Sequence, residues 1–80
     1  MASRVRIKNG WLMVPYRGED LSRVEIATGE REYGDWRGAF LSWDGRERVA
    51  MIRPPQTKAR SLKVWLRVDQ VAEMVGTVRL

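Results

Sequence analysis

The dipeptide Asp44-Gly45 lies between two apolar-rich runs, and it constrains the fold more than any other feature of the sequence. Such a pair is a strong signal for a tight β-hairpin, because a type I′ turn needs positive φ at both central residues. The arms of the hairpin are predicted at Ala39–Trp43 and Arg48–Arg53. The stretch from Val24 to Ile52 is therefore predicted to form a strand, a glycine-containing turn, a second strand, the hairpin turn and a third strand.

The other strands are predicted from the alternation of apolar and polar residues with a period of two. A second hairpin dipeptide, Asn9-Gly10, separates the first two of them. Pro54-Pro55 ends strand pairing after the central stretch, because neither residue can donate to a ladder. The strands predicted outside the Asp44-Gly45 hairpin are Ser3–Lys8, Trp11–Tyr16, Leu21–Thr28, Ser61–Val68 and a last short strand from Val78 to Leu80.

One helical turn is predicted near the C-terminus. The carboxylate of Asp69 can cap a turn from Gln70 to Met74 by accepting hydrogen bonds from free amide groups, and Gly76 can end it. Many short strands joined by tight turns in so short a chain imply a small barrel, since closure removes exposed strand edges. We therefore expect a single domain over residues 1–80. Its expected fold is an all-β, SH3-like barrel of about five to seven short strands with this one helical turn.

Composition argues against several kinds of chemistry. The 80 residues include no Cys and no His, which excludes disulfides and thiolate–metal sites and removes the usual general base. Stability must come from packing, to which four tryptophans contribute, or from self-association into a homo-oligomer. The carboxylates Glu30, Glu32 and Asp35 share their loop with arginines that would neutralise them. We therefore expect no metal site, no cofactor and no enzymatic activity.

The charge balance favours a negatively charged partner. Fifteen Lys and Arg residues stand against ten Asp and Glu residues, which gives a net charge of +5. A basic chain of this kind suits nucleic acid or an acidic protein surface. No apolar run approaches the ~20 residues of a membrane span, and no signal-peptide core is present, so we expect a cytoplasmic protein that does not contact membranes.

The central stretch carries a short glycine-based motif. It consists of Val24-Glu25-Ile26, Gly29, the loop Glu30–Arg37 and the strand entry Gly38-Ala39-Phe40-Leu41. This order of features resembles the KOW module of NusG-type transcription elongation factors and some ribosomal proteins. The segment Lys63–Val71 is similar to the final strand and terminal turn of that module.

The resemblance covers roughly Leu21 to Met74, with a loop longer than the usual KOW spacing and an additional hairpin, Arg4–Tyr16, ahead of it. It implies an SH3-like barrel that binds RNA, DNA or ribonucleoprotein machinery, linked to transcription or translation, and that does not catalyse a reaction.

The predicted strand Ser61–Val68 carries a candidate nucleic-acid-binding surface. Every second residue of this strand lies on the same face, and on one face these residues are Lys63, Trp65 and Arg67. A base could stack on the tryptophan ring, and the two positive charges could neutralise phosphates. The alternative is that Trp65 packs under the N-terminal hairpin and that the two cations are ordinary solvated residues. The basic loop adds Lys58 and Arg60 to the candidate surface. Whether the ligand would be RNA or DNA stays open.

A second basic stripe and a loop tip are further candidates. Arg4, Arg6 and Lys8 share one strand face, where they would contact phosphate or protect a sheet edge from aggregation. The loop tip offers a recognition patch of the kind found at binding hot spots, unless its tryptophan folds back into the barrel. The partner-binding candidates are Tyr33, Trp36 and Arg37.

Three functions follow from these candidates. The first is a non-catalytic nucleic-acid- or ribonucleoprotein-binding barrel. The second is a protein–protein interaction module, such as a small phage- or plasmid-type accessory protein that docks on a host complex. The third is a remote alternative, in which the barrel forms a stable tetramer around a shared active-site pore, as some small SH3-like reductases do.

Overall fold

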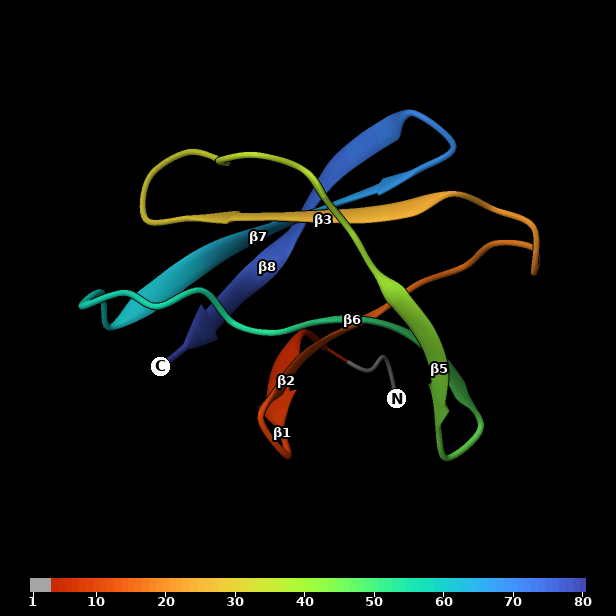
Figure 1. The fold of residues 1–80 in the computed structure, drawn as a ribbon, viewed down its shortest axis with the longest axis horizontal. Helices are drawn as coiled ribbons and strands as arrows, with labels where there is room; N and C mark the ends of the chain where they lie inside the picture. Colours follow the sequence, from red (N-terminus) through yellow and green to blue (C-terminus); the bar gives the residue numbers. More distant parts are fainter. Residues whose placement is uncertain (1–3) are drawn as a thin grey trace.

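The computed structural model describes residues 4–80, which form two four-stranded antiparallel β-sheets (Figure 1). The first sheet has the order β1-β2-β6-β5 and the second the order β4-β3-β7-β8. The strands are β1 (Arg6–Lys8), β2 (Trp11–Pro15), β3 (Val24–Gly29), β4 (Arg37–Gly38), β5 (Phe40–Asp44), β6 (Glu47–Ile52), β7 (Ser61–Val68) and β8 (Val71–Arg79). The expectation of an all-β fold is confirmed. Ser3, in the first predicted strand, lies outside the described residues.

Both predicted hairpins form, but their turns differ. Asn9 and Gly10 have φ values of 53° and 79°, which is the type I′ pattern. In the other hairpin, Asp44 pairs with Glu47 as the last residue of β5. The turn consists of Gly45, with a φ of 67°, and Arg46, whose φ is not positive. This pattern is type II′ with glycine at its first position, so the predicted type I′ geometry is wrong there.

The predicted helical turn after Asp69 does not form. Asp69 and Gln70 have φ values of 48° and 74° and make a two-residue hairpin turn that joins β7 to β8. The Asp69 carboxylate accepts a hydrogen bond from the Arg23 backbone N–H at 2.7 Å and does not cap a helix. The open edge of β7 takes a strand as its partner, because the valine-rich segment that follows can supply a complete ladder. The predicted strand near Val78 is therefore only the end of the nine-residue β8.

Gly76 also has a different role from the predicted one. The β7–β8 register shifts between Val64↔Gly76 and Trp65↔Met74, so that Val75 is the additional residue of a β-bulge. Gly76 has a φ of 153°, a conformation that L-residues rarely adopt. It therefore accommodates the bulge and does not end a helical turn.

The hydrophobic core lies between the two sheets. Alternate residues of β7 face inward, as their period of two predicted, and they meet inward-facing residues of β2, β3 and β6. Burial of each large apolar side chain stabilises the fold by roughly 1.5–3 kcal/mol. The buried members of this core are Val5, Leu12, Val14, Val24, Ile26, Ala50, Ile52, Leu62, Val64, Leu66 and Val78.

The chain passes from one sheet to the other at Ala39. This residue separates β4, which pairs with β3, from β5, which pairs with β6. Its backbone N–H donates to the Val24 carbonyl at 3.1 Å, which anchors the crossing point. On another side of the core, Val5 lies against the glycine of the β8 bulge.

Within residues 4–80, no helix is long and apolar enough to cross a membrane.

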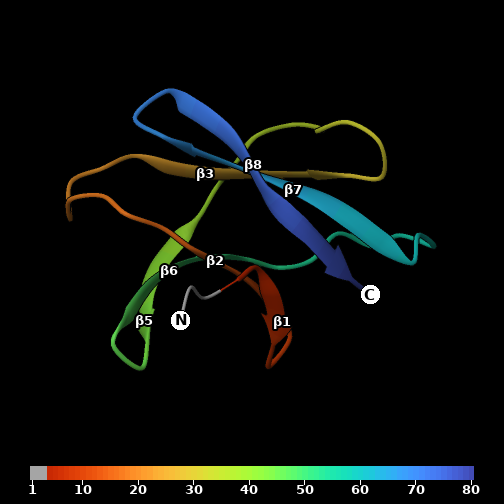
Figure 2. The same cartoon turned by 180° about the vertical axis from the view of Figure 1, so that it is seen from behind.

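Ion pairs join the two outer strands of the first sheet. The hairpins β1–β2 and β5–β6 extend on the same side of the molecule, as Figure 1 and the reverse view in Figure 2 show. Arg6 and Lys8 of β1 contact the Asp44 carboxylate of β5 at 2.5 and 2.7 Å, and Arg6 also reaches Glu47 at 3.3 Å. The first sheet must be strongly curled, because strands at its opposite edges come within side-chain reach.

The ion pairs at Asp44 predict a pH-dependent stability. Hydrogen bonds from Lys8 and Arg6 lower the pKa of Asp44 below its ordinary value of 3.8. A lowered folded-state pKa stabilises the fold above the ordinary value, and this contribution is lost as the pH falls through the lowered one. We expect Asp44→Asn to lower the melting temperature at neutral pH; this deficit should shrink as the pH falls below 3.8 and disappear once the pH is below the lowered pKa of the folded state. Circular dichroism melts across the pH range would measure it.

Asp35→Asn is the matched control, because Asp35 is exposed and takes part in no ion pair of the described residues. A deficit for Asp44→Asn that is the same at every pH, or equal to that of the control, would contradict the assignment.

Candidate functional site

The outer face of β7 carries the three predicted nucleic-acid residues. Lys63, Trp65 and Arg67 point away from the core, and each is half-buried. The loop between β3 and β4 covers them: Lys63 donates to the Arg31 carbonyl at 3.3 Å, and Tyr33 packs edge-on against Trp65 with ring centroids 5.6 Å apart. The covering segment is therefore this loop and not the N-terminal hairpin.

Arg67 has two partners inside the molecule. Its guanidinium donates two hydrogen bonds to the Glu25 carboxylate, at 3.1 and 2.9 Å, and lies 4.4 Å from the centroid of the Trp36 ring. Glu25 is only 7% exposed. The hydrogen bonds from Arg67 lower the pKa of Glu25 below its ordinary value of 4.5, and the charges of Arg67 and Arg23 add to this effect. The positive charge of Arg67 is thus largely compensated where it lies.

The aromatic residues of both predicted sites form one group, which we call the loop cluster: Tyr33, Trp36, Trp65 and Arg67. Tyr33 contacts both tryptophans, with centroid distances of 5.6 Å to each. Trp36 folds back onto Arg67 and is half-buried, whereas Tyr33 remains 55% exposed. Tyr33 is therefore the part of the loop cluster that a partner could contact.

Gly29 lets the loop fold back over β7. A Cβ atom at this position would lie 1.7 Å from the Glu32 carbonyl oxygen. The Gly34 N–H also donates to the Thr28 carbonyl at 3.1 Å, which closes the loop on itself. The glycine is required by this close approach of backbone to backbone, since its φ is not in the left-handed region.

We expect Gly29→Ala to destabilise the fold by about 1–3 kcal/mol, because the added methyl group forces the loop backbone to move. Gly38→Ala is the control, since a Cβ at Gly38 would meet nothing within 4 Å and φ is not positive there. Urea denaturation of both variants measures the difference. Equal stability of the two variants would show that the loop does not pack on Gly29.

A second aromatic group lies on the outer face of the first sheet, where sequence reasoning did not find it. The Arg53 guanidinium lies 3.8 Å from the centroid of the Trp11 ring, and Phe40 packs edge-on against the same ring at 5.7 Å. Arg53 also donates to the Gly10 carbonyl at 3.0 Å. Phe40 is 67% exposed.

Arg37 belongs to this second group and not to the loop cluster. It donates to the Arg53 backbone carbonyl at 2.8 Å, so that its guanidinium contacts the backbone of Arg53. We call Trp11, Arg37, Phe40 and Arg53 the arginine–aromatic corner. Among residues 4–80, neither arginine of the corner is paired with a carboxylate.

The other predicted cations are dispersed. Lys58 and Arg60 are exposed in the segment that joins β6 to β7, and the Arg60 carbonyl accepts a hydrogen bond from the Leu80 N–H at 2.8 Å. In the Arg4, Arg6 and Lys8 stripe, the last two residues pair with Asp44, and Arg6 also donates to the Arg4 carbonyl. The stripe is thus engaged in holding the first sheet together.

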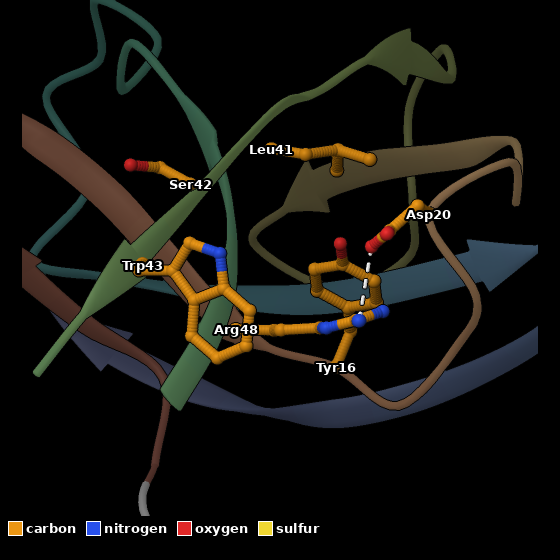
Figure 3. Close-up of a pocket in the computed structure, with 6 residues that line it drawn as sticks. All are labelled: Tyr16, Asp20, Leu41, Ser42, Trp43 and Arg48. Carbon is orange, nitrogen blue, oxygen red and sulfur yellow. Dashed lines mark ion pairs between the residues drawn. The ribbon is translucent and has the colours of Figure 1, made fainter. Parts of the chain in front are cut away.

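A pocket beside β5 is lined by an ion pair and two aromatic rings (Figure 3). Arg48 crosses it, pairs with Asp20 at 2.9 Å, donates to the Gly18 carbonyl and lies 5.3 Å from the Trp43 ring centroid. In the described part of the chain, no three carboxylate, imidazole or thiol side chains converge on a metal-sized site. The lining residues are Tyr16, Asp20, Leu41, Ser42, Trp43 and Arg48.

Comparison of the chain with protein-family models, with curated proteins and with solved structures gave no match.

Proposed function

We propose that this protein is a non-catalytic nucleic-acid-binding domain that holds a single strand of RNA or DNA at the arginine–aromatic corner. The observation that carries the proposal is the contact of Arg53 with the Trp11 ring, at 3.8 Å, beside the exposed Phe40 ring. Successive bases stack on aromatic rings and guanidinium planes, whereas adjacent cations neutralise the phosphates. The corner provides both the aromatic rings and the cations, and its residues contact one another.

The arginines of the corner are more available to a phosphate group than Arg67 on the β7 face. Arg67 is paired with Glu25 and stacked on Trp36, so a phosphate would have to compete with a buried carboxylate. Among residues 4–80, Arg53 and Arg37 donate only to backbone carbonyls, which leaves most of their N–H groups without a partner in that part of the chain. The net charge of +5 adds a long-range attraction for polyanions.

The fold is compatible with a family of nucleic-acid-binding barrels. We propose that the two sheets, which the chain links directly at Ala39, form an SH3-like barrel related to the KOW module. The two-residue turns and the glycine-dependent loop after β3 support this classification. Under it, the N-terminal hairpin is an addition that supplies Trp11 to the corner.

Fluorescence anisotropy with labelled single-stranded RNA, single-stranded DNA and duplex DNA across a salt series tests the function. Phe40→Ala should weaken single-strand binding by about 1–3 kcal/mol, which is roughly 5- to 150-fold, because one stacking ring is lost. Arg53→Gln should reduce the slope of log Kd against log salt by about 0.7, since one phosphate contact disappears.

Tyr33→Ala and Lys63→Gln, at the loop cluster and the β7 face, are the matched comparison, because these residues form the competing surface. We expect both to bind like the wild type. Selective loss of binding in this second pair would move the site to β7. No binding of any nucleic acid at low salt would refute the proposed function and would favour the protein-docking alternative, with the exposed Tyr33 as its contact.

A further inference from the structure

The described sheets have four edge strands, and three of them are protected against pairing. Natural proteins protect sheet edges with charged residues, short strands or bulges. β1 has three residues, two of them basic, and β4 has only two. β8 exposes apolar residues, but it contains the bulge at Val75 and carries Glu73 and Arg79.

The edge strand β5 is different. It exposes Phe40, Leu41 and Trp43, with 67, 40 and 61% of their surfaces accessible. Its five residues contain no lysine, arginine or proline. Its one charge, Asp44, is already paired with β1. Among the four edge strands, β5 is therefore the one that is least protected against pairing with another strand.

The backbone groups that β5 leaves unpaired can be identified from its register. Asp44 and Glu47 flank a two-residue turn and form a hydrogen-bonded pair, so the pairs alternate from there along the hairpin. Trp43↔Arg48 and Leu41↔Ala50 are then non-hydrogen-bonded pairs. The Tyr16 N–H donates to the Arg48 carbonyl, as expected if the backbone of Arg48 faces β2. The N–H and C=O groups of Leu41 and Trp43 consequently point outward from the sheet.

We propose that β5 pairs with β5 of a second copy of this chain, antiparallel about a two-fold axis at Ser42. Ser42 is the middle residue of β5, so all five residues of one strand find partners in the other. Leu41 of one protomer then lies opposite Trp43 of the other, and both outward-facing pairs exchange hydrogen bonds. The two first sheets would join into one continuous eight-stranded sheet.

The self-complementarity of this register favours a second copy over an unrelated strand. A two-fold interface needs each residue of the patch to suit its counterpart. The Leu41–Trp43 pair is apolar on both sides, and cross-strand pairs of this type stabilise sheets. Asp44 falls opposite Phe40, and its charge is already neutralised by Arg6 and Lys8. A small core of this kind, in a sequence without Cys, is also stabilised by additional buried area.

The proposal is argued from the edge of β5 and not from the nucleic-acid site. Leu41 and Trp43 lie on the face of β5 that lines the pocket in Figure 3. Phe40 projects from the opposite face, because successive residues of a strand alternate. In the dimer, Phe40 would have Asp44 of the second copy as its cross-strand neighbour, whereas Trp11 of β2 and Arg53 after β6 belong to parts of the sheet away from the joined edges.

Cross-linking through a single introduced cysteine tests the register. At a non-hydrogen-bonded antiparallel pair the Cα atoms are about 4.5 Å apart, which is within disulfide range. Because the chain contains no Cys, Ser42→Cys carries the only thiol. We expect it to form a disulfide-linked dimer at least tenfold faster than Ala72→Cys on the β8 edge. Ala72 is more exposed than Ser42, so random collisions would favour the control.

Sedimentation velocity of the wild type and of Trp43→Lys completes the test, with circular dichroism to verify that the variant is folded. We expect the wild type to dimerise with increasing concentration and Trp43→Lys to remain monomeric. The proposal would be overturned by a monomeric wild type, by a dimer that persists in folded Trp43→Lys, or by Ser42→Cys cross-linking no faster than the control.

Discussion

Apolar contact between the inner faces of the two sheets is the interaction on which the other features depend. Val14 and Ala50 of the first sheet and Ile26 and Val64 of the second belong to one core, and Val14, Ile26 and Val64 are completely buried. With the inner faces in contact, the outer faces are left to the polar and aromatic groups. The loop cluster lies over the outer face of β7 in the second sheet, whereas Trp11 and Phe40 of the arginine–aromatic corner belong to strands of the first sheet.

The sequence was informative where structure is local. The alternation in β7 predicted its buried face, and the Asn9-Gly10 and Asp44-Gly45 pairs located two hairpins. The third hairpin was missed because Asp69 and Gln70 adopt positive φ without a glycine, and because an Asp before the segment Gln70–Met74 also suits a helix cap. Asn and Asp tolerate this conformation through local hydrogen bonds, so the two outcomes differ little in sequence.

The candidate sites could be predicted only in part, because they depend on strand order. The aromatic and basic residues of β7 were found from their alternation, but their pairing with Glu25 and Tyr33 requires β3 and its loop to lie beside them. The corner requires the order β2-β6-β5, which brings Trp11 and Phe40 together across an intervening strand. A count of charged residues is limited in the same way, because it does not show which Lys and Arg residues form ion pairs with carboxylates.

The way in which the chain alternates between sheets also has a kinetic consequence. The hairpins β1–β2, β5–β6 and β7–β8 are local, whereas β2 pairs with β6 and β3 pairs with β7 over long separations in sequence. Loop-closure entropy makes such non-local pairings slow, so domains dominated by them fold in about milliseconds to seconds. Until the first sheet packs against it, the valine-rich hairpin of β7 and β8 has no apolar surface to cover its inner face. The rate at which these distant strands meet therefore determines how long a nascent chain is exposed to aggregation.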